Sequence, residues 1–175
     1  MINYKKMTIK AQEAIQDTVK LAENLSQQML QVEHLTYSII SQKDGLLRPL
    51  LQKLGVNTEM VLEEIKTILD NLPKVSGSTS PTLSNDAQRA IDYAFDEAKK
   101  MGDEYVSTEH LLLGAIEHAG YSLRKLFTIH GIDKKNIIKA IKEIRGTTKI
   151  TDQNPEEKMN TLEKYTINLL VEMKK

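Results

Sequence analysis

Two stretches that begin alike, VEHLTYSII at Val32–Ile40 and TEHLLLGAI at Thr108–Ile116, decide the fold of this 175-residue chain. Each places Glu-His directly before an apolar run, and the two pairs lie 76 residues apart. A Glu-His pair can belong to a catalytic site, to half of a metal site, or to the first turn of a helix. Its recurrence indicates that either a short motif or a whole structural unit occurs twice.

The repeat extends far beyond the two Glu-His pairs. Residues Met7–Ile68 align without a gap with Leu83–Ile144, and 16 of the 62 aligned pairs are identical. The identical pairs include Ala11/Ala87, Gln12/Gln88, Ala14/Ala90, Ile15/Ile91, Ala22/Ala98, Arg48/Arg124 and Gly55/Gly131. Chance rarely produces so many matches in one register, so we infer that a complete structural unit is duplicated.

The apolar spacing within each unit predicts helices. In the first unit, one helical face is formed by residues spaced four, three, four and three apart, namely Ala11, Ile15, Thr18, Ala22 and Leu25. The same face recurs in the second unit at Ala87, Ile91, Ala94, Ala98 and Met101. No segment shows the sustained alternation of apolar and polar residues that indicates a strand. We therefore predict an all-α fold made of two pseudo-symmetric four-helix repeats.

Capping residues predict where these helices begin and end. The expected N-caps of the first and fourth helices are Thr8, Asn57, Ser84 and Asp133. Each second helix begins at its Glu-His pair. The third helices, at about residues 46–54 and 123–130, are followed by Gly55 and Gly131, which are typical C-cap signals.

Two polar stretches divide the chain. The segment Asn71–Asn85 holds two prolines, a glycine and several Ser and Thr residues, so it is expected to link the two repeats. A second non-helical stretch is expected at Arg145–Gln153, and Asn154 and Pro155 then begin an amphipathic helix that continues to the end of the chain. The expected units are a domain over 1–146, with repeats at about 7–70 and 83–145, and a linker with the start of a helix over 147–175.

Composition narrows the possible partners and compartments. Lys plus Arg and Asp plus Glu both number 24, and no long basic block occurs, which argues against a nucleic-acid partner. The absence of cysteine excludes disulfides and thiolate metal sites and fits a reducing compartment. There is no secretory signal core and no run of about 20 apolar residues, so we expect no membrane partner. We expect a cytoplasmic protein, with an organellar location as the alternative.

The Glu-His pairs lack the companions that chemistry would require. Neither His34 nor His110 has a second His, Cys or Asp three or four residues later, so the spacing of a helical zinc site is missing. Phosphate-binding and nucleophile-elbow motifs are also missing, and we predict neither a catalytic nor a metal-binding residue. The favoured interpretation is structural: the histidine bonds back to the preceding loop while Leu35 or Leu111 enters the core. A free-standing metal-dependent hydrolase is kept as a remote alternative.

The acidic loop of the second repeat has no counterpart in the first. Asp103 corresponds to Gln27, whereas Glu109 corresponds to Glu33. A functional surface on a duplicated scaffold often lies where the copies diverge, but plain divergence of a solvated surface explains the same pattern. Acid–base catalysis by Asp103, Glu104 and Glu109 is a further, less favoured interpretation.

A resemblance to a known family rests on these same residues. The stretches MTIKAQEAI and LSNDAQRAI, each followed by a Glu-His-Leu turn in a duplicated helical unit, resemble the Clp N-terminal domain of AAA+ unfoldases. The tail TDQNPEEKMNTLEKYTINLL at Thr151–Leu170 is similar to the segment that leads into the first ATPase module of ClpB-type disaggregases. It departs from that family at YTINLLVEM, where relatives carry an acidic sequence.

This resemblance implies a function in binding rather than catalysis. It implies a substrate-binding module that engages exposed apolar segments of unfolded or aggregated client proteins. The parent protein is expected to be a homohexameric ATPase whose ATP and Mg sites lie in modules missing from this chain. The fragment itself is expected to be a monomer without a cofactor. The alternative within the family is the adaptor- and substrate-binding domain of a protease-coupled ClpA/ClpC-like unfoldase.

The resemblance also implies a set of substrate-binding residues. The family's functional polar positions fall on Thr8, Asp103 and Glu109, and groove positions on the first helix of the second repeat fall on Tyr93 and Glu97. Relatives commonly carry aliphatic residues at the last two positions, so Glu97 departs from the pattern, while Tyr93 could stack on a peptide. We expect a groove near the first helices of the two repeats, with acidic residues that attract clients carrying basic flanks.

Overall fold

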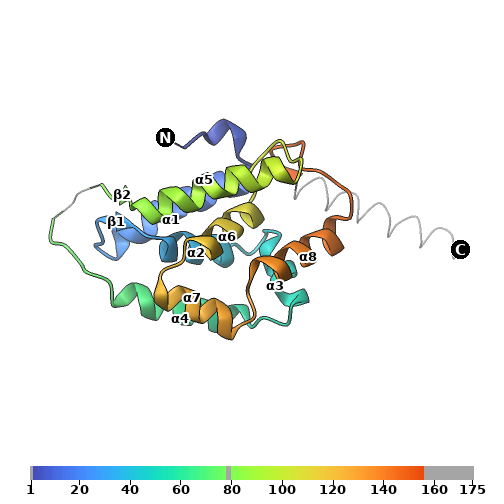
Figure 1. Cartoon of the computed structure of the whole chain (residues 1–175). Coiled ribbons are helices and arrows are strands. Elements are labelled where there is room, and N and C mark those ends of the chain that lie inside the picture. Colours follow the sequence, from blue (N-terminus) through green and yellow to red (C-terminus); the bar gives the residue numbers. More distant parts are fainter. Residues whose placement is uncertain (1, 78–79, 156–175) are drawn as a thin grey trace, which may run out of the picture.

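Eight α-helices in two sets of four make up the part of the chain described by the computed structural model, residues 2–77 and 80–155 (Figure 1). The first set contains α1 (Ile9–Asn24), α2 (Val32–Ser41), α3 (Leu47–Lys53) and α4 (Thr58–Asp70). The second set contains α5 (Asn85–Lys100), α6 (Thr108–Glu117), α7 (Tyr121–Ile129) and α8 (Lys134–Arg145). The predicted all-α fold is confirmed.

The predicted N-caps act as expected. Thr8 and Ser84 accept hydrogen bonds from the backbone N–H of Ala11 and Ala87, at 3.2 and 3.0 Å. Asn57 and Asp133 cap α4 and α8 in the same way. One prediction is displaced, because α7 begins at Tyr121, two residues earlier than expected. The helix predicted after Pro155 lies outside the described residues.

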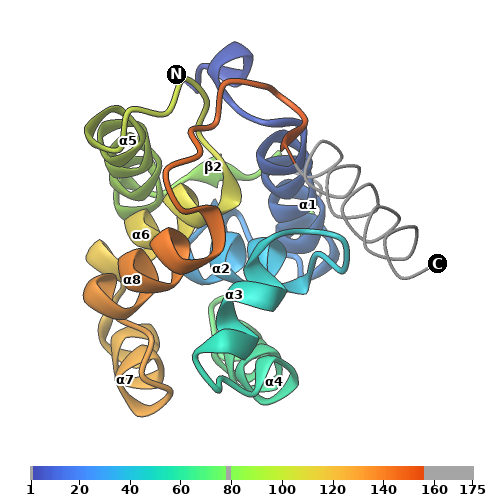
Figure 2. The same cartoon turned by 90° about the vertical axis from the view of Figure 1, so that its right-hand side faces the viewer.

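The two sets of helices are related by an approximate twofold axis. Helices α2 and α6, which occupy equivalent positions, pack against each other, while α3 packs on α8 and α4 packs on α7. In Figure 1, α1 and α5 form the upper layer and α4 and α7 the lower layer. Figure 2 shows the first half in blue to cyan on the right and the second half in green to orange on the left. The apolar faces of the two halves therefore share one core.

Short parallel pairings tie the halves together in a reciprocal way. Strand β1 (Met29–Leu30) pairs with β2 (Thr82–Leu83), and Met7 forms an isolated parallel bridge with Val106. Met7 and Val106 are the repeat equivalents of Leu83 and Leu30. The residue before the first helix of each half is thus bonded to the residue before the second helix of the other half. Sequence patterning missed these pairings because two residues are too short to show alternation.

One close approach distinguishes the second half from the first. A Cβ atom on Gly114 of α6 would lie 1.9 Å from the carbonyl oxygen of Ala90 on α5, so only glycine fits there. The equivalent residue in the first half is Ser38, which is buried. Helices α5 and α6 therefore pack closer together than a side chain at this position would allow.

Candidate functional site

Each Glu-His pair forms the first turn of its helix, as predicted. The backbone N–H of Gln31 donates to Nδ1 of His34, and the backbone N–H of Ser107 donates to Nδ1 of His110, both at 2.9 Å. These bonds make Nδ1 an acceptor, so Nε2 carries the proton in each neutral imidazole. Both rings are fully buried. The histidines therefore fix the loop before each helix, which confirms the structural interpretation.

The two rings differ in what Nε2 meets. Nε2 of His34 donates to Oε1 of Gln27, while Nε2 of His110 donates to Oδ2 of Asp103 at 2.8 Å. Burial lowers the pKa of His34 to about 4. Gln27 is neutral and also donates to the carbonyl of Leu69, so no charge offsets that burial. At this pair of equivalent positions, the second repeat therefore buries a carboxylate, Asp103, where the first repeat buries the neutral amide of Gln27.

Asp103 anchors a buried ionic network at one end of the domain. Nη1 of Arg145 donates to both of its carboxylate oxygens, at 2.9 and 3.1 Å, and the backbone N–H of Ile150 donates at 2.9 Å. Burial alone would raise the pKa of Asp103, but the hydrogen bonds from His110, Arg145 and Ile150 and the charge of Arg145 lower it well below its usual range. Asp103 is therefore anionic throughout the neutral range.

Glu109 belongs to the same network. Its Oε1 accepts a hydrogen bond from the Ser107 hydroxyl, and its Oε2 lies 3.5 Å from Nε of Arg145. The side chains of Asp103 and Glu109 are 0% and 2% exposed. The predicted pair of acids is thus brought together, but it is held inside the domain. Asp103 contacts His110, Arg145 and Ile150, and Glu109 contacts Ser107 and Arg145.

The network also holds the segment Gly146–Gln153, which we call the strap. Ile150 is buried, and its carbonyl accepts from the backbone N–H of Glu104 at 2.8 Å. Further along, the carbonyl of Gln153 accepts from the backbone N–H of Ile9 at 2.8 Å. Figure 2 shows the strap in orange, running from α8 past the end of α5 to the start of α1. The stretch predicted to be a linker instead packs against the domain.

Thr8 lies near this network, and its hydrogen bonds are to backbone groups and not to the charged side chains. It is fully buried, its hydroxyl caps α1, and its backbone N–H donates to the carbonyl of Val106 at 2.9 Å. Since Val106 belongs to the loop that follows Asp103, the predicted polar residues of both halves converge on one region. Thr8 contributes to it through the backbone and through its capping hydroxyl.

Tyr93 and Glu97 form a separate cluster on the other side of α5. Nζ of Lys134 donates to Oη of Tyr93 at 2.6 Å and to Oε1 of Glu97 at 2.9 Å. The ring of Tyr93 also meets the ring of His118 edge to face, with centroids 5.9 Å apart. Burial would raise the pKa of Glu97, but hydrogen bonds from Lys134 and Tyr93 outweigh that effect and lower it. Glu97 is thus a buried anion with a defined partner.

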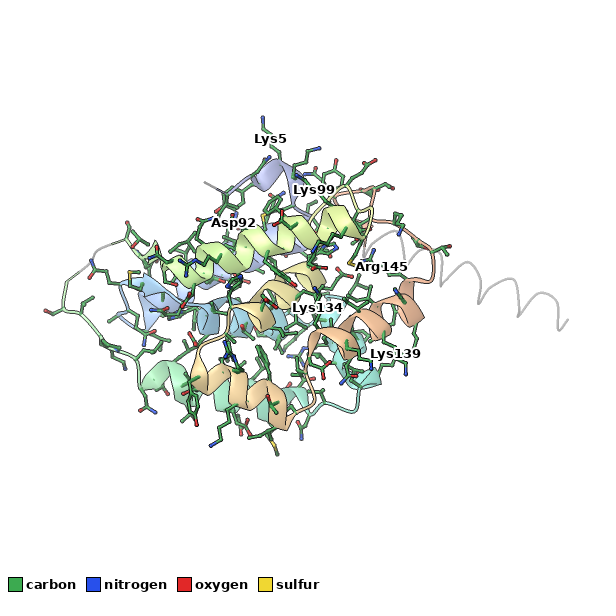
Figure 3. The ribbon with its side chains drawn as sticks, viewed as in Figure 1. Lys5, Asp92, Lys99, Lys134, Lys139 and Arg145 are labelled. Atoms are coloured by element: carbon green, nitrogen blue, oxygen red, sulfur yellow. The ribbon has the colours of Figure 1, made fainter. Side chains whose placement is uncertain are left out.

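A hollow of about 460 Å³ lies on the opposite face of α5, between this helix and the N-terminal segment that contains the short 3₁₀ helix η1 (Tyr4–Lys6). It is lined by Ile2, Asn3, Lys6, Ile91, Asp92, Phe95, Ala98, Lys99, Asp103, Glu104 and Val106. Figure 3 labels Asp92 and Lys99 along the upper side of α5. An apolar floor with charges of both signs around it suits an apolar side chain in a polar peptide.

The hollow and the Tyr93 cluster cannot be one groove. Residues on α5 advance by about 100° each, so the lining residues 91, 92, 95, 98 and 99 share one face, and Tyr93 and Glu97 lie on the opposite face. The structure thus brings Thr8, Asp103 and Glu109 into one region and leaves Tyr93 and Glu97 in another.

Sequence reasoning missed Arg145, the residue that holds the two acids together. One signal was available, since Arg145 follows Ile141 by four residues on the apolar stripe of α8 and replaces Leu69 of the first repeat. A charged residue at a core position usually has a buried partner of opposite charge. The distance in sequence from Asp103 concealed which partner it was.

Other kinds of site find no support within residues 2–77 and 80–155. No group of three or more His, Cys, Asp or Glu side chains in these ranges is arranged to hold a metal ion. None of the helices described there is both long and apolar enough to cross a membrane.

Sequence comparison identifies relatives along nearly the whole chain. The family model "Clp repeat (R) N-terminal domain" matches residues 6–129. The chain is 34% identical over 168 residues to the chaperone protein ClpB of Bacteroides thetaiotaomicron, and 38% identical over 164 residues to ClpB 2 of a Nostoc species. These matches cover 96% and 93% of the chain and 19% of each relative. The chain thus spans about a fifth of the length of these relatives.

Solved structures agree on the fold. The Hsp104 N-terminal domain from Candida albicans matches with a TM-score of 0.74 and 20% identity, covering 85% of this chain and 97% of that one. A complex of the ClpV N-domain with a VipB peptide matches with a TM-score of 0.65 and 15% identity, covering 82% and 89%. With the duplicated four-helix unit and the matching family model, the chain belongs to the Clp repeat N-terminal domain family.

Proposed function

We propose that this chain is the client-binding N-terminal module of an ATP-dependent, ClpB-like protein disaggregase. The observation that carries the proposal is the hollow beside α5, with its apolar floor and its rim of mixed charge. A module that captures unfolded chains must bury an apolar side chain without reading a defined sequence. Burial of apolar surface contributes about 25 cal/mol per Å², and association costs offset much of that gain, so weak and reversible binding is expected.

The comparisons support this proposal from two directions. The relatives at 34% and 38% identity are ClpB chaperones. The ClpV N-domain, which has the same fold, is known in complex with a VipB peptide, so a domain of this kind is able to hold a peptide. Unfolded or aggregated proteins with exposed apolar segments are the clients proposed here.

The ATPase modules of the parent protein are proposed to lie outside this chain. ATP and Mg²⁺ would bind in the ATPase modules of the parent, which would assemble as a homohexamer in the cytoplasm or in an organelle. This domain alone would be a monomer without a cofactor, and light scattering tests that point. A protease-coupled ClpA/ClpC-like parent is the second candidate, and recovery of a peptidase with the full-length protein would favour it.

An NMR titration with a permanently unfolded protein tests the client site. Phe95→Ser, in the hollow, should weaken binding about tenfold, because this half-buried ring supplies much of the accessible apolar surface there. Tyr93→Ser is the matched control, since it makes a similar change on the opposite face of the same helix. A loss of binding in Tyr93→Ser alone would instead place clients on the Tyr93 cluster.

A further inference from the structure

A second hollow lies on the other side of the C-terminal end of α5. It has a volume of about 620 Å³ and is lined by the end of α5, by α8 and by the strap residues Gly146–Lys149. It shares no lining residue with the first hollow, between α5 and the N-terminal segment, which we call the client hollow. Met101, Ile138 and Ile141 form an apolar floor, of which Ile141 is buried and the other two are half-buried. The floor therefore leaves apolar surface that a ligand could cover.

Every ionisable group that lines this second hollow is basic. Lys100, Lys142 and Lys149 surround the floor together with Arg145, and no acidic residue is among the lining residues. The whole chain carries 24 basic and 24 acidic residues, so this excess of positive charge is local. Figure 3 labels Arg145 between the end of α5 and α8.

These cations are incompletely neutralised by the domain itself. Lys142 forms no ion pair with any residue in the described ranges, and Lys100 lies 3.8 Å from Glu97, which is already paired with Lys134 at 2.9 Å. The ammonium group of Lys149 is held by the carbonyl of Met101 at 2.7 Å, which is a neutral acceptor. An anionic ligand would therefore find free or weakly paired cations here.

Arg145 supplies a second and independent observation. Its side chain is 5% exposed, and its Nη2 has no hydrogen-bond partner among the described residues, although Nη1 is bonded to Asp103. Buried polar groups in folded proteins nearly always have a hydrogen-bond partner, so a buried donor without one is costly. A carboxylate entering this hollow is an acceptor of the kind that is missing.

A simpler explanation accounts for only part of this pattern. Lys100, Lys142 and Arg145 lie in or near the last turns of α5 and α8, where the negative end of the helix dipole favours cations. Lys149 lies outside any helix, and the dipole explains neither the apolar floor nor the unpartnered Nη2 of Arg145. The combination fits a ligand that is both anionic and apolar.

We propose that the second hollow binds an acidic segment of a partner protein, in which carboxylates flank an apolar side chain. The carboxylates pair with Nη2 of Arg145 and with Lys142 and Lys149, and the apolar side chain covers Met101 and Ile138. This site is separate from the client hollow and does not depend on it. An acidic partner and an apolar client can therefore occupy the domain together.

NMR titration of the whole chain with a short peptide of leucines flanked by glutamates tests this inference. The amide shifts should cluster at Met101, Ile138 and Thr147–Lys149, and should leave Phe95 in place. Affinity should fall about tenfold as NaCl rises from about 0.05 to about 0.5 M, because salt screens the surface charges. The same peptide with glutamine in place of glutamate should bind at least about fivefold more weakly.

A repeat-matched pair of variants provides the control. Lys142→Glu should weaken binding by at least about fivefold, whereas Lys66→Glu, which makes the same charge change at the equivalent position of α4, should leave it unchanged. Equal binding by both variants, or equal binding of the glutamine peptide, would overturn the proposal. Tighter binding of single-stranded RNA than of the acidic peptide, with the same shifts, would overturn it in favour of a nucleic-acid site. Shifts at Phe95 alone would support the client hollow and contradict this one.

Discussion

At the scale of single residues, two buried imidazoles accept the same kind of backbone hydrogen bond at Nδ1 but have different partners at Nε2. His34 faces the neutral amide of Gln27, whereas His110 faces the carboxylate of Asp103. Protonation of His34 at Nδ1 would oppose the backbone N–H of Gln31 that already donates there, and Gln27, the partner at Nε2, carries no charge that would offset the added one. The first repeat therefore holds a histidine that resists protonation.

His34 should make stability depend on pH between about 6.5 and 4. Its pKa is about 4 when folded and about 6.5 when unfolded, so the unfolded chain binds more protons in this window and stability is lost as pH falls. The loss attributable to His34 should reach about 3 kcal/mol near pH 4. In His34→Gln, the difference in unfolding free energy from wild type should be largest at pH 7.5 and should shrink at pH 4.5, as measured by urea denaturation. A difference that stays constant across these pH values would rule the explanation out.

At the scale of elements, two residues of the second half, Gly114 and Asp103, determine how its helices pack. Gly114 lets α6 approach the backbone of α5, and Asp103 joins the turn after α5 to the end of α8 and to the strap. Both positions differ from their repeat equivalents, Ser38 and Gln27. The second half is thus packed and anchored differently from the first, on the same set of helices.

Gly114→Ala should destabilise the domain by about 3 kcal/mol or more, because the new Cβ would overlap a backbone carbonyl that cannot rotate away. Ser38→Ala is the matched control at the equivalent position, where a side chain is already accommodated, and should cost less than about 1 kcal/mol. Thermal and urea unfolding followed by circular dichroism measures both variants. Similar melting temperatures for the two variants would show that α5 and α6 can separate without cost.

Asp103→Ala should release the strap and destabilise the domain by about 3–5 kcal/mol, since it removes the partner of the buried Arg145. Hydrogen exchange by NMR should show faster exchange for the amide of Ile150, which loses its acceptor. The exposed neighbour provides the control, because Glu104→Gln leaves its backbone bond to Ile150 intact. Unchanged protection of Ile150 in Asp103→Ala would mean that the strap is held by other contacts.

At the scale of the whole molecule, the halves are interlocked as well as packed together. The pairing of β1 with β2 and the bridge between Met7 and Val106 exchange one connection in each direction. The apolar faces of α2 and α6 meet on the approximate twofold axis. One four-helix unit of about 62 residues would also be only marginally stable on its own. The two repeats therefore form a single folding unit.

A chain comprising residues 80–155 alone should be largely unfolded, because it lacks both its strand partner and the apolar face that covers α6. Mixing it with residues 1–77 should restore helicity, since the break falls in the segment between the repeats. Circular dichroism and size-exclusion chromatography follow both steps. A cooperative melt by the isolated second half would show that each repeat folds on its own.

The sequence alone was sufficient to predict the eight helices, the N-caps of α1, α4, α5 and α8 and the duplicated unit, because those features depend on spacing and capping chemistry within a few residues. It also predicted the structural role of His34 and His110, whose partners lie three residues away. The surroundings of the predicted acids depend on tertiary packing and could not be read from local sequence. Arg145 and Ile150 lie 42 and 47 residues from Asp103, and packing rather than local pattern brings them there. Likewise, the hollow beside Phe95 and the cluster of Tyr93 and Glu97 lie on opposite faces of α5, and tertiary packing determines which neighbours each face meets.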